Sequence, residues 1–220
     1  KGLRLISNGA GFLGMADPGF PQRQRFLKQA WDLDAGHIIV DLGPCASGNL
    51  FDFFSLSNKS IIVLAPEPQF VQSAFDFLRG FVYRRLATIF SDNFAISALI
   101  SEATDARGDN PVKTFSDLCE RISSVDRERA QKAIAEIKRF RPGLLLDMAA
   151  SHDDVKAVDA LASASKTFLS LDTDFIGVIY SRPEALAASG MKRLFMLDGD
   201  AVDAKKDIEG VISCLIGERQ

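Results

Sequence analysis

An aspartate stands at the end of a strongly apolar run in residues 37–44, HIIVDLGP. A continuous run of β-branched residues is typical of a strand buried on both faces of a parallel sheet. An aspartate that follows such a strand lies at the carboxyl edge, where open α/β sheets bind their ligands. We therefore predict a strand over residues 38–41 and a ligand-binding role for Asp41. The alternative interpretation is an aspartate that caps a helix.

The remaining elements follow from the same pattern of apolar residues. Strands are predicted over residues 61–65, 144–148 and 175–180, and short strand segments over residues 3–6 and 194–197. Helices are predicted over residues 22–33, 68–86, 89–101, 153–169, 183–190 and 203–216, and over a segment capped by Ser123 or Ser124 that ends at Phe140. This alternation predicts a single α/β domain over residues 1–220, with a mostly parallel sheet and helices on both faces.

The composition limits the possible classes of function but does not identify one. The chain has 220 residues, of which 47% are hydrophobic and 25% charged, and these are ordinary globular values. A formal net charge of -3 gives no electrostatic case for nucleic acid as a partner. No apolar run approaches the roughly 20 residues of a membrane span. The three cysteines are far apart in the sequence, which favours a reducing, cytoplasmic environment and argues against disulfides or a zinc site.

A glycine pattern suggests a dinucleotide site, and the residues that follow it argue against one. Gly9, Gly11 and Gly14 form a G-x-G-x-x-G sequence after the strand predicted over residues 3–6. In a Rossmann site a helix starts within this pattern, so that its N-terminus faces the pyrophosphate. Pro18 and Pro21 would break that helix within about two turns. A glycine-rich loop is therefore the favoured interpretation, and a Rossmann oxidoreductase stays open as an alternative.

Three other groups of residues carry weaker chemical signals. His152, Asp153 and Asp154 suggest a metal site, but Ser151 or Asp153 capping a helix explains them better. Cys45 and Ser47 lack a histidine placed as their base, so nucleophilic catalysis is disfavoured. The arginines of residues 79–85 could form a binding patch, although a solvated helix face is the simpler interpretation.

Four segments in this order resemble the MinD/ParA-type ATPases, the deviant Walker group of P-loop NTPases, and in particular the branch of the flagellar-number regulators FlhG and FleN. Residues 38–44 resemble the family's Walker B strand and the start of switch II. Residues 61–68, IIVLAPEP, resemble the next strand and its Pro-rich turn. Residues 144–148 resemble the strand that ends in an adenine-contacting Asn, and residues 175–180 resemble the last core strand, which usually ends in Gly-x-Ile-Pro. Here Asp147 and Tyr180 replace the Asn and the proline.

The resemblance implies a P-loop NTPase-like fold and a site for ATP and Mg²⁺. It implies that Asp41 acts on Mg²⁺ through water as a catalytic residue, and that Gly43 senses the γ-phosphate. It also implies that Asp147 and Tyr180 border the base. The implied activity is an ATP-dependent switch, in which the ATP-bound homodimer positions a protein partner and slow hydrolysis releases it.

The family's phosphate-binding loop is missing from this sequence. The chain contains neither G-x-x-x-x-G-K-[ST] nor the K-G-G-x-G-K variant, which hold the β- and γ-phosphates. The family's first strand lies in mid-sheet, so its loss would expose apolar edges. We therefore expect residues 1–220 to be the C-terminal portion of a longer ATPase domain, inactive alone. The alternative is a degenerate, non-hydrolytic module that binds a partner through the helices of residues 68–101.

Those helices are rich in phenylalanine. The chain has 17 phenylalanines against two tyrosines and one tryptophan, and six fall close together: Phe70, Phe75, Phe77, Phe81, Phe90 and Phe94. Helical spacing places Phe70, Phe77 and Phe81 on one inward stripe and leaves Phe75 near the surface. Two interpretations stay open, that all six pack in the core or that this region meets a partner or a second copy of the chain.

Overall fold

The computed structural model describes residues 4–6, 29–30, 32–43, 48–104, 112–183, 185 and 201–217. The chain divides into two compact units, residues 1–53 and residues 54–220, and each is described by itself.

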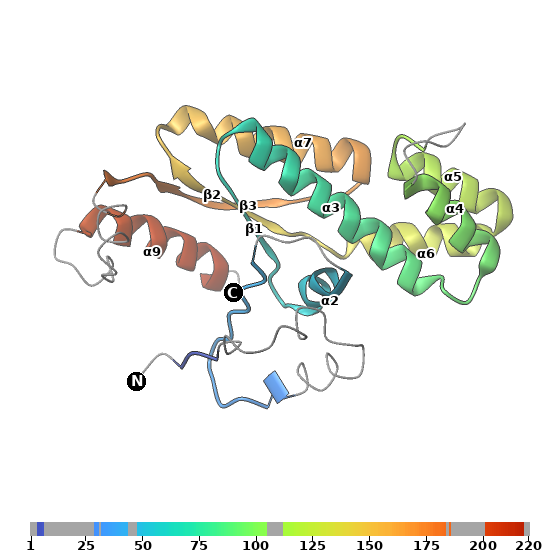
Figure 1. Cartoon of the computed structure of the whole chain (residues 1–220), viewed down its shortest axis with the longest axis horizontal. Coiled ribbons are helices and arrows are strands. Elements are labelled where there is room, and N and C mark those ends of the chain that lie inside the picture. Colours follow the sequence, from blue (N-terminus) through green and yellow to red (C-terminus); the bar gives the residue numbers. More distant parts are fainter. Residues whose placement is uncertain are drawn as a thin grey trace, which may run out of the picture. The chain divides into compact units, whose positions relative to one another are not determined.

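The second unit is built on a parallel sheet. Its strands are β1 (Ile61–Leu64), β2 (Gly143–Ala149) and β3 (Asp174–Tyr180), in the order β1-β2-β3 (Figure 1). Both neighbouring pairs are parallel. Three of the predicted strands and the α/β class are thus confirmed.

Helices cover both faces of this sheet. Leu144 and Leu146 of β2 are fully buried on the face that carries α3 (Pro68–Ile89) and α7 (Lys156–Leu169). On the other face, α9 (Val202–Gly217) packs against β3, and a Cβ atom at Gly177 would lie 2.6 Å from Val211 Cγ2. Figure 1 shows α9 across the sheet from α3 and α7. The predicted arrangement with helices on both faces is therefore present.

Aromatic rings form the centre of the core between α3 and its neighbours. The ring of Phe81 meets Phe54 and Phe140 edge to face, with centroids 5.1 and 5.0 Å apart, and Phe54 also meets Phe77 at 5.2 Å. Phe54 belongs to the C-terminal part of α2 (Gly48–Leu56). Such pairs add about 0.5–1.5 kcal/mol each beyond the burial of their area. The inward positions of Phe77 and Phe81 were predicted correctly.

The other phenylalanines correct the predicted pattern. Phe70 was placed on the inward stripe, but it is 47% exposed in the first turn of α3. Phe75 is half-buried, since its ring packs edge to face on Phe168 of α7. Phe90 is fully buried, whereas Phe94 is 90% exposed. The interpretation that all six rings pack in the core is therefore wrong.

A group of three helices lies at the C-terminal end of α3: α4 (Phe94–Thr104), α5 (Phe115–Val125) and α6 (Arg127–Lys138). A helix capped by Ser123 or Ser124 and ending at Phe140 was predicted, and α6 confirms this helix with different bounds. Asp126 separates α5 from α6, because its carboxylate accepts the Arg129 N–H as the N-cap of α6.

Helix α5 was missed by the sequence analysis. Thr114 caps it in a reciprocal capping box with Asp117, in which each side chain accepts the other residue's backbone N–H. After β2, a short 3-10 helix, η1 (His152–Val155), precedes α7. Of the two predicted caps, Ser151 and Asp153, Ser151 holds the N-cap position, and Asp154 accepts its backbone N–H at 2.9 Å.

The strand predicted over residues 38–41 is wrong. Residues 37–43 form no regular secondary structure, and the exposed fractions of Ile38, Ile39 and Val40 are 41%, 93% and 47%. A run of β-branched residues becomes a strand only when neighbouring strands satisfy its backbone groups, and the described part of residues 1–53 contains none. Residues 4–6 also form no strand. The G-x-G-x-x-G pattern, Cys45, Ser47 and the segment 194–197 lie outside the described residues.

Within the described ranges, no helix is both long and apolar enough to cross a lipid bilayer.

Candidate functional site at the carboxyl edge of the sheet

The three parallel strands end at one edge, and each end has its own backbone signature. After β1 the chain passes through Pro66 and Glu67 into α3, whose first residue is Pro68. Proline suits this position because its missing N–H would have no partner in the first turn of a helix. Glu67 is the N-cap residue of α3 but makes no side-chain capping bond.

The end of β2 is irregular. The pairing of β2 with β3 shifts register between Leu146 and Ala149, and Met148 between them has a φ of 58°. A non-glycine residue in this region is strained and is uncommon outside turns and functional sites. The carboxylate of Asp147 accepts the Met148 N–H at 2.9 Å. The bulge changes the direction of the half-buried Asp147 side chain at the edge where ligands bind in open α/β sheets.

Asp154 supports the turn that follows β2. One oxygen of its carboxylate accepts the N–H groups of Ala150 at 2.7 Å and Ser151 at 2.9 Å. These bonds give Asp154 a structural role in the turn, and Asp153 pairs with Lys156 at 3.2 Å. Within the described ranges, no group of three or more His, Cys, Asp or Glu side chains is arranged to hold a metal ion.

The end of β3 carries a polar cluster that the sequence analysis did not find. Asp207 of α9 accepts the Tyr180 N–H at 3.3 Å and the Arg182 guanidinium at 2.6 Å, through the same oxygen. Only 23% of the Arg182 side chain and 16% of the Asp207 side chain are exposed. A half-buried, charge-assisted pair of this kind holds the strand end firmly against α9. No local motif in the sequence joins residues 182 and 207, so only the fold reveals the pair.

Asp41 and Gly43 form a tight turn in the first unit. The Asp41 carboxylate accepts the Gly43 N–H at 2.9 Å, and Gly43 has a φ of 67°, which favours glycine. An aspartate that bonds the backbone two residues later is a common turn builder. Asp41 is exposed and does not follow a strand.

The four residues implied by the resemblance fall into two pairs. Asp41 and Gly43 lie in the first unit, whereas Asp147 and Tyr180 lie in the second. Within the second unit, Tyr180 pairs in register with Ala149, two residues after Asp147, so the ends of β2 and β3 lie side by side. Asp147 and Tyr180 are therefore on neighbouring strand ends.

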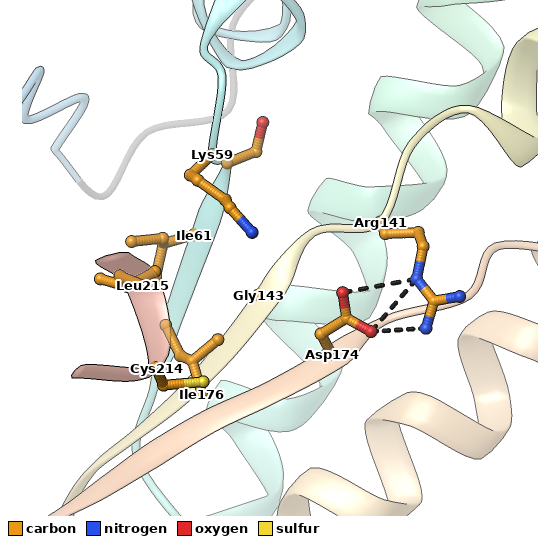
Figure 2. A pocket seen from close by; sticks show the side chains of 9 residues that line it. Lys59, Ile61, Arg141, Gly143, Asp174, Ile176, Cys214 and Leu215 are labelled. Carbon is orange, nitrogen blue, oxygen red and sulfur yellow. Dashed lines mark hydrogen bonds and ion pairs between the residues drawn. The ribbon is translucent and has the colours of Figure 1, made fainter. Parts of the chain in front are cut away.

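The opposite edge of the sheet is a packed junction. Figure 2 shows Arg141 and Asp174 joined there by a forked ion pair, with Nη2 2.5 Å and Nε 3.1 Å from the same carboxylate oxygen. Lys59, Ile61 and Cys214 line a cavity of about 10 Å³ beside it. This cavity holds about one water molecule.

Comparison of the chain with models of protein families, with curated proteins and with solved structures finds no match.

Proposed function

We propose that the chain is part of a MinD/ParA-like ATP-dependent switch, in which ATP binding and slow hydrolysis control dimerisation and the positioning of a protein partner. One observation carries this proposal. Three of the segments on which the resemblance depends form adjacent parallel strands, in chain order. Their ends place the turn at Pro66, Asp147 and Tyr180 along a single edge.

Asp147 and Tyr180 would border the nucleotide base in this proposal. The bulge at Met148 sets the direction of Asp147, and the Tyr180 backbone is fixed through Asp207. A carboxylate accepts hydrogen bonds only, whereas the amide of an Asn also donates them. Asp147 would therefore bind the exocyclic amino group of a base and could not donate to a ring nitrogen.

Asp41 and Gly43 would serve the magnesium and γ-phosphate end of the site. Mg²⁺ is usually held by one or two carboxylates together with phosphate oxygens and water, so a single exposed carboxylate fits a water-mediated contact. The Gly43 N–H is bonded to Asp41, and contact with a phosphate would exchange that carboxylate for a phosphate oxygen. The Asp41 carboxylate suits Mg²⁺, and the Gly43 N–H suits a phosphate oxygen. The sequence holds no loop that would bind the remaining phosphate oxygens.

The edge of the sheet supports a phosphate-binding segment outside residues 1–220. Among the described residues β1 has a strand neighbour on only one side. An open, apolar strand edge is normally paired or covered. The proposal requires a further strand beside β1 and a phosphate-binding loop. A segment outside residues 1–220 would supply both.

A partner-binding module without hydrolysis is the second candidate. It is favoured by the exposed Phe94 and by the groove between α3 and α4, in the helices where a partner surface was predicted. The two candidates differ in whether the complete gene product binds ATP.

Calorimetry with Mg·ATP tests the proposal on two proteins, residues 1–220 and the complete gene product. We expect no micromolar binding to residues 1–220, and Mg²⁺-dependent binding to the complete product. Micromolar binding to residues 1–220 would contradict the requirement for an outside phosphate loop. Absence of binding to both would favour the partner-binding module, and tight binding of NADH would favour a Rossmann oxidoreductase.

A further inference from the structure

A groove of about 540 Å³ runs between α3 and α4, away from the carboxyl edge of the sheet. Figure 1 shows α4 beside the C-terminal part of α3, the part farthest from the turn at Pro68. Gly80 and Ala87 lie two helical turns apart on the α3 side of the groove, with Tyr83 between them, and Ile100 lines the α4 side. Because Gly80 and Ala87 have little or no side chain, they leave the space that larger residues would fill.

The most exposed aromatic ring of the described residues lies on the same face of α4. Ser97 and Ser101 line the groove, and Phe94 precedes them by three and seven residues. Residues at these spacings share one face of a helix. Phe94 therefore projects beside one end of the groove, with 90% of its side chain exposed. An exposed aromatic side chain of this kind is the usual anchor of a protein interface.

The charges around the groove are of both signs. Asp76, Arg79 and Arg84 line its α3 side, and the Arg79 guanidinium lies over the Tyr83 ring, 5.8 Å from the centroid. In a twofold contact, Asp76 of one copy can pair with an arginine of the other. A strongly acidic or basic partner would have no such match.

We propose that this face joins two copies of the chain, with Phe94 of each copy inserted in the α3–α4 groove of the other. A twofold interface requires one surface that carries both a projection and the hollow that accepts it. Phe94 and the groove meet this requirement on adjacent turns of α4. The contact goes beyond the proposed function, since it uses no nucleotide and lies away from the carboxyl edge.

Two substitutions remove the two halves of the contact separately. Phe94→Ser removes the projection, and Ala87→Leu fills the hollow while leaving Phe94 in place. Phe70→Ser is the matched control, because Phe70 is also an exposed phenylalanine but lies in the first turn of α3, outside the groove. Phe94 and Ala87 are not in the fully buried core, so both variants are expected to fold.

Sedimentation equilibrium without nucleotide measures the association. We expect a reversible dimer of the unmodified chain, roughly tenfold or more weaker association in both test variants, and unchanged association in the Phe70→Ser control. A monomer at all concentrations, a dimer that forms only with Mg·ATP, or equal weakening by the control would overturn the proposal. Circular dichroism of each variant separates loss of the contact from loss of the fold, and if one test variant unfolds, the other decides the result.

Discussion

Gly177 sets how closely α9 approaches the sheet. Its φ is 150°, a conformation that side chains rarely adopt, and an added Cβ would lie 2.6 Å from Val211 Cγ2. We therefore expect Gly177→Ala to lower the free energy of unfolding by about 2 kcal/mol. Gly210 is an exposed residue within α9, and a Cβ added there would meet no atom within 4 Å. Gly210→Ala should therefore raise the free energy of unfolding by up to about 1 kcal/mol. Urea denaturation of both variants checks the contrast, and equal effects would refute the close contact.

Burial makes Cys119 chemically inert. It raises the pKa of the Cys119 thiol to about 12, so that almost no thiolate is present at neutral pH. Cys214 is only half-buried. We expect iodoacetamide at about pH 8 to modify Cys214 well before Cys119 in the folded protein, as followed by peptide mass spectrometry. Equal rates in the native state, with both thiols reactive after denaturation, would contradict this environment.

Only some residues of the candidate site could be predicted from the sequence. Asp147 and Tyr180 could be placed near a sheet edge because each ends an apolar run, and the structure brings those ends together. Arg182 and Asp207 could not be found, because 25 residues separate them and only the packing of α9 on β3 joins them. The positive φ at Met148 likewise depends on the register shift between two strands, and no local residue pattern encodes it.

Helix boundaries depend on single capping residues. Thr114 accepts the Asp117 N–H at 3.1 Å at the start of α5, which satisfies one of the unpaired donors there. Thr114→Ala should lower stability by about 1 kcal/mol. Ser124→Ala in the last turn of α5 removes a hydroxyl that bonds only the Arg121 carbonyl, and it should change stability by less than about 0.5 kcal/mol. Thermal melting compares the two, and equal losses would show that the cap has no special role.

Strands were predicted well where they have neighbours and poorly where they do not. The runs that form β1, β2 and β3 pair with one another, so their apolar pattern and their structure agree. Residues 38–41 have the same pattern but no strand, because apolar character alone does not satisfy backbone donors and acceptors. Helix α5 was missed although Thr114 and Asp117 form a capping pair before its apolar residues, and the cap of α6 was placed two or three residues early because Ser123 and Ser124 are also good capping residues.

In the second unit as a whole, the cluster of aromatic rings packs the helices against the sheet. Phe81 is 1% exposed and contacts the rings of both Phe54 and Phe140. Phe81→Ala should cost about 3–5 kcal/mol, since it removes a large buried ring and leaves a cavity. Phe70→Ala, at a side chain that is 47% exposed, should cost far less. Calorimetric unfolding of both variants tests this, and similar losses would place Phe70 in the core after all.

Asp41 is the residue whose substitution tests the proposed switch most directly. This residue is exposed, and its described bond is the turn contact with Gly43, so Asp41→Ala should leave the fold and its melting temperature nearly unchanged. The most direct measurement is Mg²⁺-dependent ATP hydrolysis by the complete gene product, with and without this substitution. We expect slow turnover in the unmodified protein and a decrease of about 10- to 100-fold in the variant. Absence of turnover in the unmodified protein, or an unchanged kcat in Asp41→Ala, would contradict the account.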